Sequence, residues 1–199
     1  MNRHDMRNKL LIAGALCVFA ANVSADSGFS IDILAGNAYQ KTEIQDLSFS
    51  GSSLSLGVRT AYAFNDYLAA ELSYIHYGEV KGSYHFDGDE YKENIESSSI
   101  NLGLKGSFPI QNGFSAVGRL GVSRWDYNVK ETYSFSPGET LKFGDEGIDL
   151  YYGLGAEYRA SNSMRIALEY TYLSMGAELN NVDFDHTVGN LALSLGYTF

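Results

Sequence analysis

The sequence has one cysteine, two prolines and fewer basic than acidic residues. Cys17 lies inside an N-terminal apolar stretch, so the rest of the chain has no thiol for a disulfide or a soft metal. The net charge of −10 makes nucleic acid a poor partner. We therefore expect no cofactor, no resident metal and no nucleic-acid ligand.

Residues 1–25 are predicted to be a cleaved signal peptide. Basic Arg3, Arg7 and Lys9 precede the apolar run Leu10 to Ala21, and the small residues Val23-Ser24-Ala25 follow it. The run is too short to span a bilayer as a helix. Residues 26–199 contain no low-complexity linker and are predicted to be a single domain.

Apolar residues in that domain alternate with a period of two, which indicates strands rather than helices. The clearest case is 53–64, where Leu54, Leu56 and Val58 share one face and small or charged residues share the other. The pattern predicts strands at 28–40, 52–64, 67–78, 97–108, 114–127, 147–158, 164–174 and 188–199. Such long strands suit a tilted crossing of a bilayer. The fold class is therefore an all-β, eight-stranded antiparallel up-and-down transmembrane β-barrel.

The predicted connections alternate between long and short. Long ones span 41–51, 79–96, 128–146 and 175–187, hold most of the acidic residues and are expected as loops in water; short ones are 65–66, 109–113 and 159–163. Bacterial outer-membrane barrels have tight periplasmic turns and longer extracellular loops, so both termini are expected in the periplasm of a Gram-negative cell.

Aromatic residues near the predicted strand ends suggest two interfacial girdles. The turn-side girdle would be Phe64, Tyr67, Phe108, Phe114, Tyr158 and Phe199; the loop-side girdle would be Tyr74, Tyr77, Trp125, Tyr127, Tyr151, Tyr152, Tyr170 and Tyr172. A soluble lipocalin-like barrel is the rival fold, with its apolar face inside. Charge on the opposite face of strand after strand favours the membrane barrel.

The small-residue face carries the charges of a predicted lumen: Asp32, Arg59, Glu71, Lys105, Arg119, Asp149, Glu157, Arg165 and Glu169. Basic and acidic groups nearly balance, as ion pairs in a closed lumen require. We predict a polar plug rather than a wide pore, with a lumenal ion-pair cluster of Arg59, Glu71, Lys105, Arg119, Glu157, Arg165 and Glu169. The pairs could rearrange to pass ions, but we favour a role in holding the barrel shut.

The residues resemble the transmembrane domain of the OmpA family over nearly all of residues 26–199. The resemblance rests on Asn65 to Tyr74, on Phe108-Pro109-Ile110 with Arg119-Leu120-Gly121 and Trp125, on Gly155 to Tyr158, on Leu168-Glu169-Tyr170, and on Leu193 to Phe199. The last segment resembles a terminal strand that the outer-membrane assembly machinery reads.

The resemblance implies a lumenal ion-pair cluster that gates a small channel. Glu71, Lys105 and Glu157 keep the family's charges, whereas Ala167 stands where the family has an arginine, and Arg165 lies one inward step nearer the turn. The chain ends at the barrel's last aromatic residue, so the family's periplasmic peptidoglycan-binding domain and cell-wall anchoring are not expected.

Enzymatic and metal-binding alternatives rest on weak patterns. Some small barrels are lipid A-editing enzymes, but His76, His85 and His186 lack the histidine-x-serine arrangement of the deacylase-like kind, and loop histidines beside aspartates are expected to be solvated. The acidic run 87–96 lacks the spacing of a calcium loop. We expect no enzyme.

The leading hypothesis is a non-enzymatic outer-membrane barrel that supports envelope integrity, with small-solute passage at low conductance as an added expectation. The alternative is an adhesin or host-resistance barrel like the OmpX and Ail group, binding a host or surface ligand through 79–96 and 128–146. That alternative rests on the loop aromatics Tyr84, Phe86, Tyr91, Tyr133, Phe135 and Phe143. Other expected partners are outer-membrane lipid, lipopolysaccharide, periplasmic chaperones and the assembly machinery.

Overall fold

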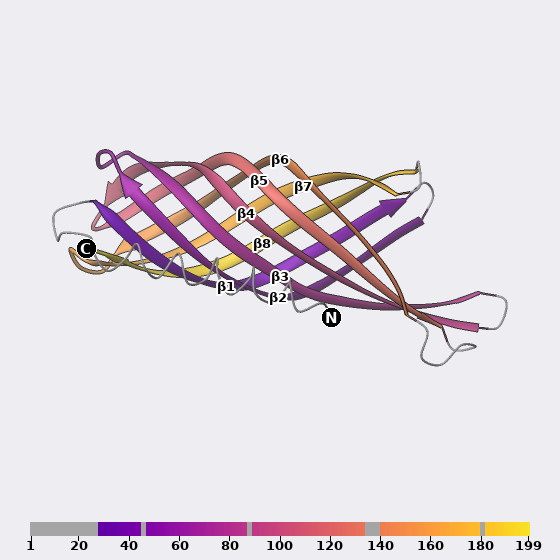
Figure 1. Cartoon of the computed structure of the whole chain (residues 1–199). Helices are drawn as coiled ribbons and strands as arrows, with labels where there is room; N and C mark the ends of the chain where they lie inside the picture. Colours follow the sequence, from indigo (N-terminus) through magenta and orange to yellow (C-terminus); the bar gives the residue numbers. More distant parts are fainter. Residues whose placement is uncertain (1–27, 45–46, 87–88, 134–139, 180–181) are drawn as a thin grey trace.

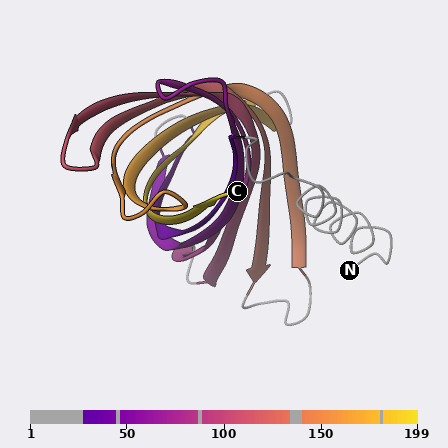
Figure 2. The same ribbon diagram turned by 90° about the vertical axis from the view of Figure 1, so that its left-hand side faces the viewer.

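A computed structural model describes residues 28–199 apart from 45–46, 87–88, 134–139 and 180–181. The chain forms one closed antiparallel barrel in which each strand pairs with its sequence neighbours and β1 pairs with β8. The strands are β1 (Phe29–Ile44), β2 (Leu47–Ala63), β3 (Leu68–Phe86), β4 (Asp89–Gln111), β5 (Phe114–Tyr133), β6 (Thr140–Arg159), β7 (Met164–Leu179) and β8 (Val182–Thr198). The predicted fold class is confirmed. Figure 1 shows the tilted strands from the side, and Figure 2 shows them curving around a common axis.

The apolar face of each strand points outward, as the membrane barrel requires. Leu54, Ile148 and Leu154 are 65%, 70% and 73% exposed, whereas the charged residues Arg59, Glu71 and Glu169 on the other face are buried in the lumen. A soluble barrel would show the reverse arrangement, so the lipocalin-like alternative is wrong. No helix in the described part of the chain is long and apolar enough to cross a membrane.

The short connections are tight turns at the end of the barrel that carries both described chain ends. Asn112 and Gly113 both have positive φ between paired Gln111 and Phe114, as a two-residue type I′ hairpin turn requires. At the β2–β3 turn, the Asn65 side-chain oxygen accepts from the backbone N–H groups of Tyr67 and Leu68. The predicted short turns at 65–66 and 159–163 are therefore confirmed, and the turn predicted at 109–113 is shorter than expected because β4 continues to Gln111.

The predicted long loops are mostly strand, which corrects the sequence interpretation. The described residues of the segments 41–51, 79–96, 128–146 and 175–187 continue β1 to β8 outward, and β3 with β4 remains paired as far as Phe86 and Asp89. Antiparallel backbone pairing continues beyond a bilayer, but side chains there no longer meet lipid on one face and lumen on the other. The period-two signal therefore fades while the strands go on. We call this end of the barrel the outer end.

Candidate functional site: the barrel lumen

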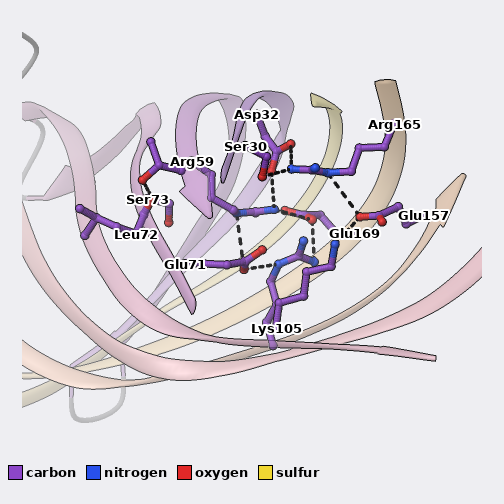
Figure 3. Close-up of polar contacts among 12 residues, drawn as sticks. Ser30, Asp32, Arg59, Glu71, Leu72, Ser73, Lys105, Glu157, Arg165 and Glu169 are labelled. Atoms are coloured by element: carbon purple, nitrogen blue, oxygen red, sulfur yellow. Dashed lines mark hydrogen bonds and ion pairs between the residues drawn. The ribbon is translucent and has the colours of Figure 1, made fainter. Parts of the chain in front are cut away.

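Charged side chains meet inside the half of the barrel nearer the turns (Figure 3). Each of the first seven strands contributes: Asp32 from β1, Arg59 from β2, Glu71 from β3, Lys105 from β4, Arg119 from β5, Glu157 from β6, and Arg165 and Glu169 from β7. All seven residues of the predicted cluster lie in this network. Their inward direction follows from strand alternation, since each has the parity opposite to its lipid-facing neighbours.

Glu169 lies between two arginines at the centre of the network. One carboxylate oxygen bonds Arg59, and the other is 3.1 Å from Arg59 Nη1 and 2.8 Å from Arg119 Nη1. Glu71 is shared in the same way, with its Oε2 atom 2.8 Å from Arg119 Nε and 3.8 Å from Arg59 Nε. All four side chains are buried, so each charge depends on its partners to offset lost hydration.

A second group of ion pairs lies next to the first. Lys105 bonds Glu157, whose Oε2 atom is also 3.6 Å from Arg165 Nε. Arg165 donates to Asp32 at 2.6 Å, to Ser30 at 2.8 Å and to Thr198 at 2.9 Å. Arg165 thus reaches both Glu157 and Asp32 from a strand position near the turn.

Asp32 joins this network, although the sequence interpretation counted it only as a lumenal charge and left it outside the cluster. The sequence feature that could have indicated this role is Gly196 on β8, which pairs with Asp32 in the β1–β8 ladder. A Cβ at Gly196 would lie 2.0 Å from Asp32 Oδ1 and 2.8 Å from Arg165 Nε. The missing side chain therefore makes room for the Asp32–Arg165 pair.

A cavity of about 580 Å³ opens at the turn end of the barrel. Lys105, Glu157 and Arg165 line it, and they are the more accessible members of the network, at 10–15% side-chain exposure. The central residues Arg59, Glu71 and Glu169 are only 1–3% exposed. Water therefore reaches the edge of the network from this end but not its centre.

The outer half of the lumen also holds a buried apolar cluster, which the sequence interpretation did not predict, beside buried polar residues such as Gln40, Ser99 and His186. The cluster is made of Ala38, Ile75, Tyr77, Ile95, Trp125, Tyr127, Tyr151, Leu173, Met175 and Val188. We call this the apolar cluster. Four of its members, Tyr77, Trp125, Tyr127 and Tyr151, were predicted for the loop-side girdle but have inward parity. Tyr152 and Tyr170 do point outward, at 54% and 49% exposure.

The aromatic rings of the apolar cluster form hydrogen bonds with polar residues beside it. Trp125 Nε1 donates to Asp149 Oδ2 at 2.7 Å, and Tyr77 shares a 2.8 Å hydrogen bond with Ser99. Gln40 accepts a hydrogen bond from the Ser97 hydroxyl at 2.7 Å and donates one to the Tyr77 carbonyl at 3.2 Å. These bonds fix ring positions, because a buried donor left unpaired would be costly.

His186 is buried, contrary to the expectation of a solvated loop histidine. It lies on β8 beyond the lipid-facing residues Leu191, Leu193 and Leu195, and its Nδ1 atom is 2.8 Å from Thr42 Oγ1. Its ring centroid is 4.6 Å from that of Tyr127, and Nε2 has no hydrogen-bond partner among the described residues. Burial lowers its pKa from 6.5 to about 4, so the imidazole is neutral at pH 7.

The described residues contain no group of three histidine, cysteine, aspartate or glutamate side chains placed to hold a metal ion. His76 Nδ1 lies 3.9 Å from Glu96 Oε1 at the surface. The side chains of His85 and of the acidic run 87–93 lie outside the described residues, as do those of the loop aromatics Tyr84, Phe86, Tyr91, Tyr133, Phe135 and Phe143.

Comparison with known proteins gives consistent matches. The model of the family described as OmpA-like transmembrane domain matches residues 25–199. Outer membrane protein A of Serratia marcescens is 28% identical over 178 residues, covering 87% of this chain and 45% of that protein. Outer membrane protein P5 of Haemophilus influenzae is 25% identical over 215 residues, covering 96% and 59%. The chain thus spans about half the length of these curated relatives.

Among solved structures, Neisserial surface protein A aligns with a TM-score of 0.57 at 20% identity, covering 87% of this chain and 98% of that one. At this identity, the match supports the barrel fold and says nothing about a shared activity.

Proposed function

Because this chain belongs to the family of OmpA-like transmembrane domains and is an outer-membrane protein, we propose that it is a closed, non-enzymatic barrel that contributes to the integrity of the outer membrane. Its apolar outer surface contacts membrane lipid, and lipopolysaccharide is the lipid partner we propose for the outer leaflet.

The observation that carries this proposal is that the lumen is filled at two levels. Toward the turn end, the buried pairs of Glu169 with Arg59 and Arg119 occupy the axis. Toward the outer end, the apolar cluster fills it, with Met175 and Trp125 at 0% and 1% exposure. A barrel of this strand number has an interior that its own side chains can fill.

Small-solute passage at low conductance is the finer form of the proposal. It needs the ion pairs to exchange partners, and Arg165 already lies within 3.6 Å of Glu157, the partner of Lys105. It also needs the apolar cluster to part, because ions do not cross a dry apolar constriction. Conducting events should therefore be rare.

Planar-bilayer recordings test the closed lumen. Wild type and Lys105→Ala should both be almost silent, because the apolar cluster remains in each. Glu169→Ala combined with Tyr127→Ala and Met175→Ala should conduct, because this variant removes the shared carboxylate of the central ion pairs and two members of the apolar cluster. Steady conductance of the wild type would contradict the closed barrel, and silence of the combined variant would remove the proposed path.

The contribution to the envelope is tested in cells. A strain that lacks the protein should become more sensitive to detergent with EDTA, and wild type or Lys105→Ala should restore resistance equally. Unchanged sensitivity of the deletion strain would contradict this role.

We also propose that residues 1–25, which lie outside the described residues, are a signal peptide removed on export. Periplasmic chaperones and the assembly machinery would then insert the barrel, with Leu193 to Phe199 as the terminal signal. The turn end, with both described chain ends, would face the periplasm, and the outer end the cell exterior.

Binding through the outer end is a second candidate function, favoured by the extension of β3 to β6 beyond the lipid-facing band. These strands carry the segments 79–96 and 128–146, the predicted binding loops. If the protein is an adhesin, deleting residues 83–92 and 134–139 should lower whole-cell adhesion and leave barrel assembly intact. Unchanged adhesion would refute it.

A further inference from the structure

The barrel is closed near the turns but splits into two sheets at its outer end. Pairing of β2 with β3 stops at Leu56 and His76, and pairing of β6 with β7 stops at Tyr151 and Leu173. Beyond these points β1, β2, β7 and β8 form one sheet, and β3 to β6 form the other. Figure 1 shows the hairpins diverging at the end away from the C-terminus.

The seam between β2 and β3 is filled by side chains. Ser53 donates to the Tyr77 carbonyl at 2.6 Å. A Cβ at Gly51 would lie 2.2 Å from a methyl carbon of Val80, and one at Gly82 would lie 2.1 Å from the Phe49 ring. The backbone edges are therefore covered by packing here, although they are not paired.

The seam between β6 and β7 is open. The contact described across this seam is a 3.3 Å hydrogen bond from the Gly176 N–H to Asp149 Oδ2. Outward from it, no described strand pairs with the β7-facing edge of β6 from Thr140 to Leu150, which we call the β6 edge.

Hydrogen bonds near the turns show which backbone groups face this edge. Arg159 N–H donates to Gly113 on the β5 side, and Ala160 N–H donates to Met164 on the β7 side. Successive residues of an antiparallel strand point their backbone groups to opposite sides. Even-numbered residues of the β6 edge, such as Gly144 and Ile148, therefore direct N–H and C=O groups away from β5. The Glu146 N–H, which also points away from β5, donates a hydrogen bond to the Asp145 side chain at 2.8 Å.

We propose that the β6 edge is a docking site for an extended, basic polypeptide segment of another protein, which pairs with it as an added strand. A row of unpaired N–H and C=O groups along a strand is the template that such a segment recognises. The site extends the second candidate function, binding through the outer end, and does not depend on the closed lumen.

Charge selects the occupant. Asp126, Asp145, Glu146 and Asp149 lie along or beside the β6 edge, and Asp185 lies opposite Gly176 on β8. Arg124 lies 3.0 Å from Glu146, and within the β6 edge three acidic residues, Asp145, Glu146 and Asp149, stand against one basic residue, Lys142. A second copy of this chain would bring an edge of the same net negative charge, which opposes self-pairing. A strand that carries lysine or arginine side chains would be attracted to this charge.

The test uses the purified barrel in phosphatidylcholine nanodiscs and a synthetic peptide of alternating lysine and threonine. Hydrogen exchange is read at single amides. Peptide binding should slow exchange of Gly144 and Ile148 by about tenfold or more, and should leave Asp145 and Gly147 unchanged, because these already bond β5. Equal protection of even and odd residues would overturn the proposal.

Two peptides separate strand pairing from simple charge attraction. The same lysine–threonine peptide methylated on alternate backbone nitrogens keeps its charge but loses one pairing edge, so it should bind about tenfold more weakly. A glutamate–threonine peptide should not bind. Equal affinity of the methylated and unmethylated lysine peptides would show attraction without pairing and would refute the site.

A matched pair of variants tests the protein side. Gly144→Pro removes an edge-facing N–H without breaking the β5 ladder, and should weaken peptide binding by about tenfold. Gly144→Ala keeps the N–H and should bind as wild type does. Equal affinities of the two variants would also refute the proposal.

Discussion

Glu169 balances two buried arginines, so removing it leaves both Arg59 and Arg119 short of a partner. We expect Glu169→Ala to lower the free energy of unfolding by about 3–5 kcal/mol, the usual effect of breaking a buried ion pair. Urea titration of the barrel in lipid vesicles measures this loss.

Arg124→Ala is the matched control, because the Arg124–Glu146 pair is 63% exposed. Its loss should be below about 1 kcal/mol, since solvent screens such pairs. Equal losses for the two variants would mean that the lumenal pairs are not the stabilising contacts inferred here.

His186 should make the outer end sensitive to acid. Its pKa is about 4 in the folded barrel and 6.5 in the unfolded chain, so the unfolded state takes up a proton first as the pH falls. Above pH 6.5 the ring is neutral in both states and does not destabilise the barrel. As the pH falls from 6.5 to about 4, protonation of the unfolded chain lowers the free energy of unfolding by up to about 3 kcal/mol. Urea midpoints across this range should show the loss.

His186→Gln lacks the titrating ring and should remove this part of the pH dependence. A variant with the same slope as wild type between pH 6.5 and 4.5 would assign the acid sensitivity to other groups.

At the level of the element, the β6–β7 seam is held by Asp149, which accepts from both Trp125 Nε1 and the Gly176 N–H. We expect Asp149→Ala to loosen this seam and to expose the ring of Trp125, the only tryptophan in the chain. Quenching of its fluorescence by acrylamide should rise about twofold or more, because a side chain at 1% exposure is shielded from the quencher.

Asp126→Ala removes a neighbouring exposed carboxylate and serves as the control. Quenching should stay at the wild-type level there; a rise equal to that of Asp149→Ala would show that general loss of charge, rather than the seam bond, protects the ring.

Strand ends show where sequence reasoning stops at this scale. Near the turns the predicted bounds lie within one residue of the structure except for β4, which ends at Gln111 and not at 108. Lipid on one side and lumen on the other impose alternation up to the tight turn. At the outer end the prediction placed loops at 79–96, whereas β3 and β4 continue to Phe86 and from Asp89. The backbone ladder that holds those residues leaves no comparable trace in residue type.

For the whole molecule, β1 pairs with β8 and closes the sheet into a barrel, so no strand edge is free along the part where all eight strands are paired. We expect the folded barrel to survive dodecyl sulfate at room temperature and to change its gel mobility only after boiling, with a β-type circular dichroism spectrum before heating. A helical spectrum, or one mobility at both temperatures, would contradict the closed barrel.

The sequence by itself determined the barrel, its strand number and which charges face inward, because period-two alternation separates a lipid face from a lumenal face. Only the tertiary structure decided which charges meet. Glu71 and Lys105 carry opposite charges on neighbouring strands, yet Glu71 bonds Arg119 and Lys105 bonds Glu157. Ion-pair choice depends on strand stagger and on closure, which bring distant strands across the axis.

The tertiary structure also decided what fills the outer half of the lumen. Trp125 and Tyr127 suited an interfacial girdle by composition, yet both point inward. An aromatic ring gains by burial at either place, and register alone sets its direction. The same register ends the β6–β7 ladder at Tyr151 and leaves the β6 edge open.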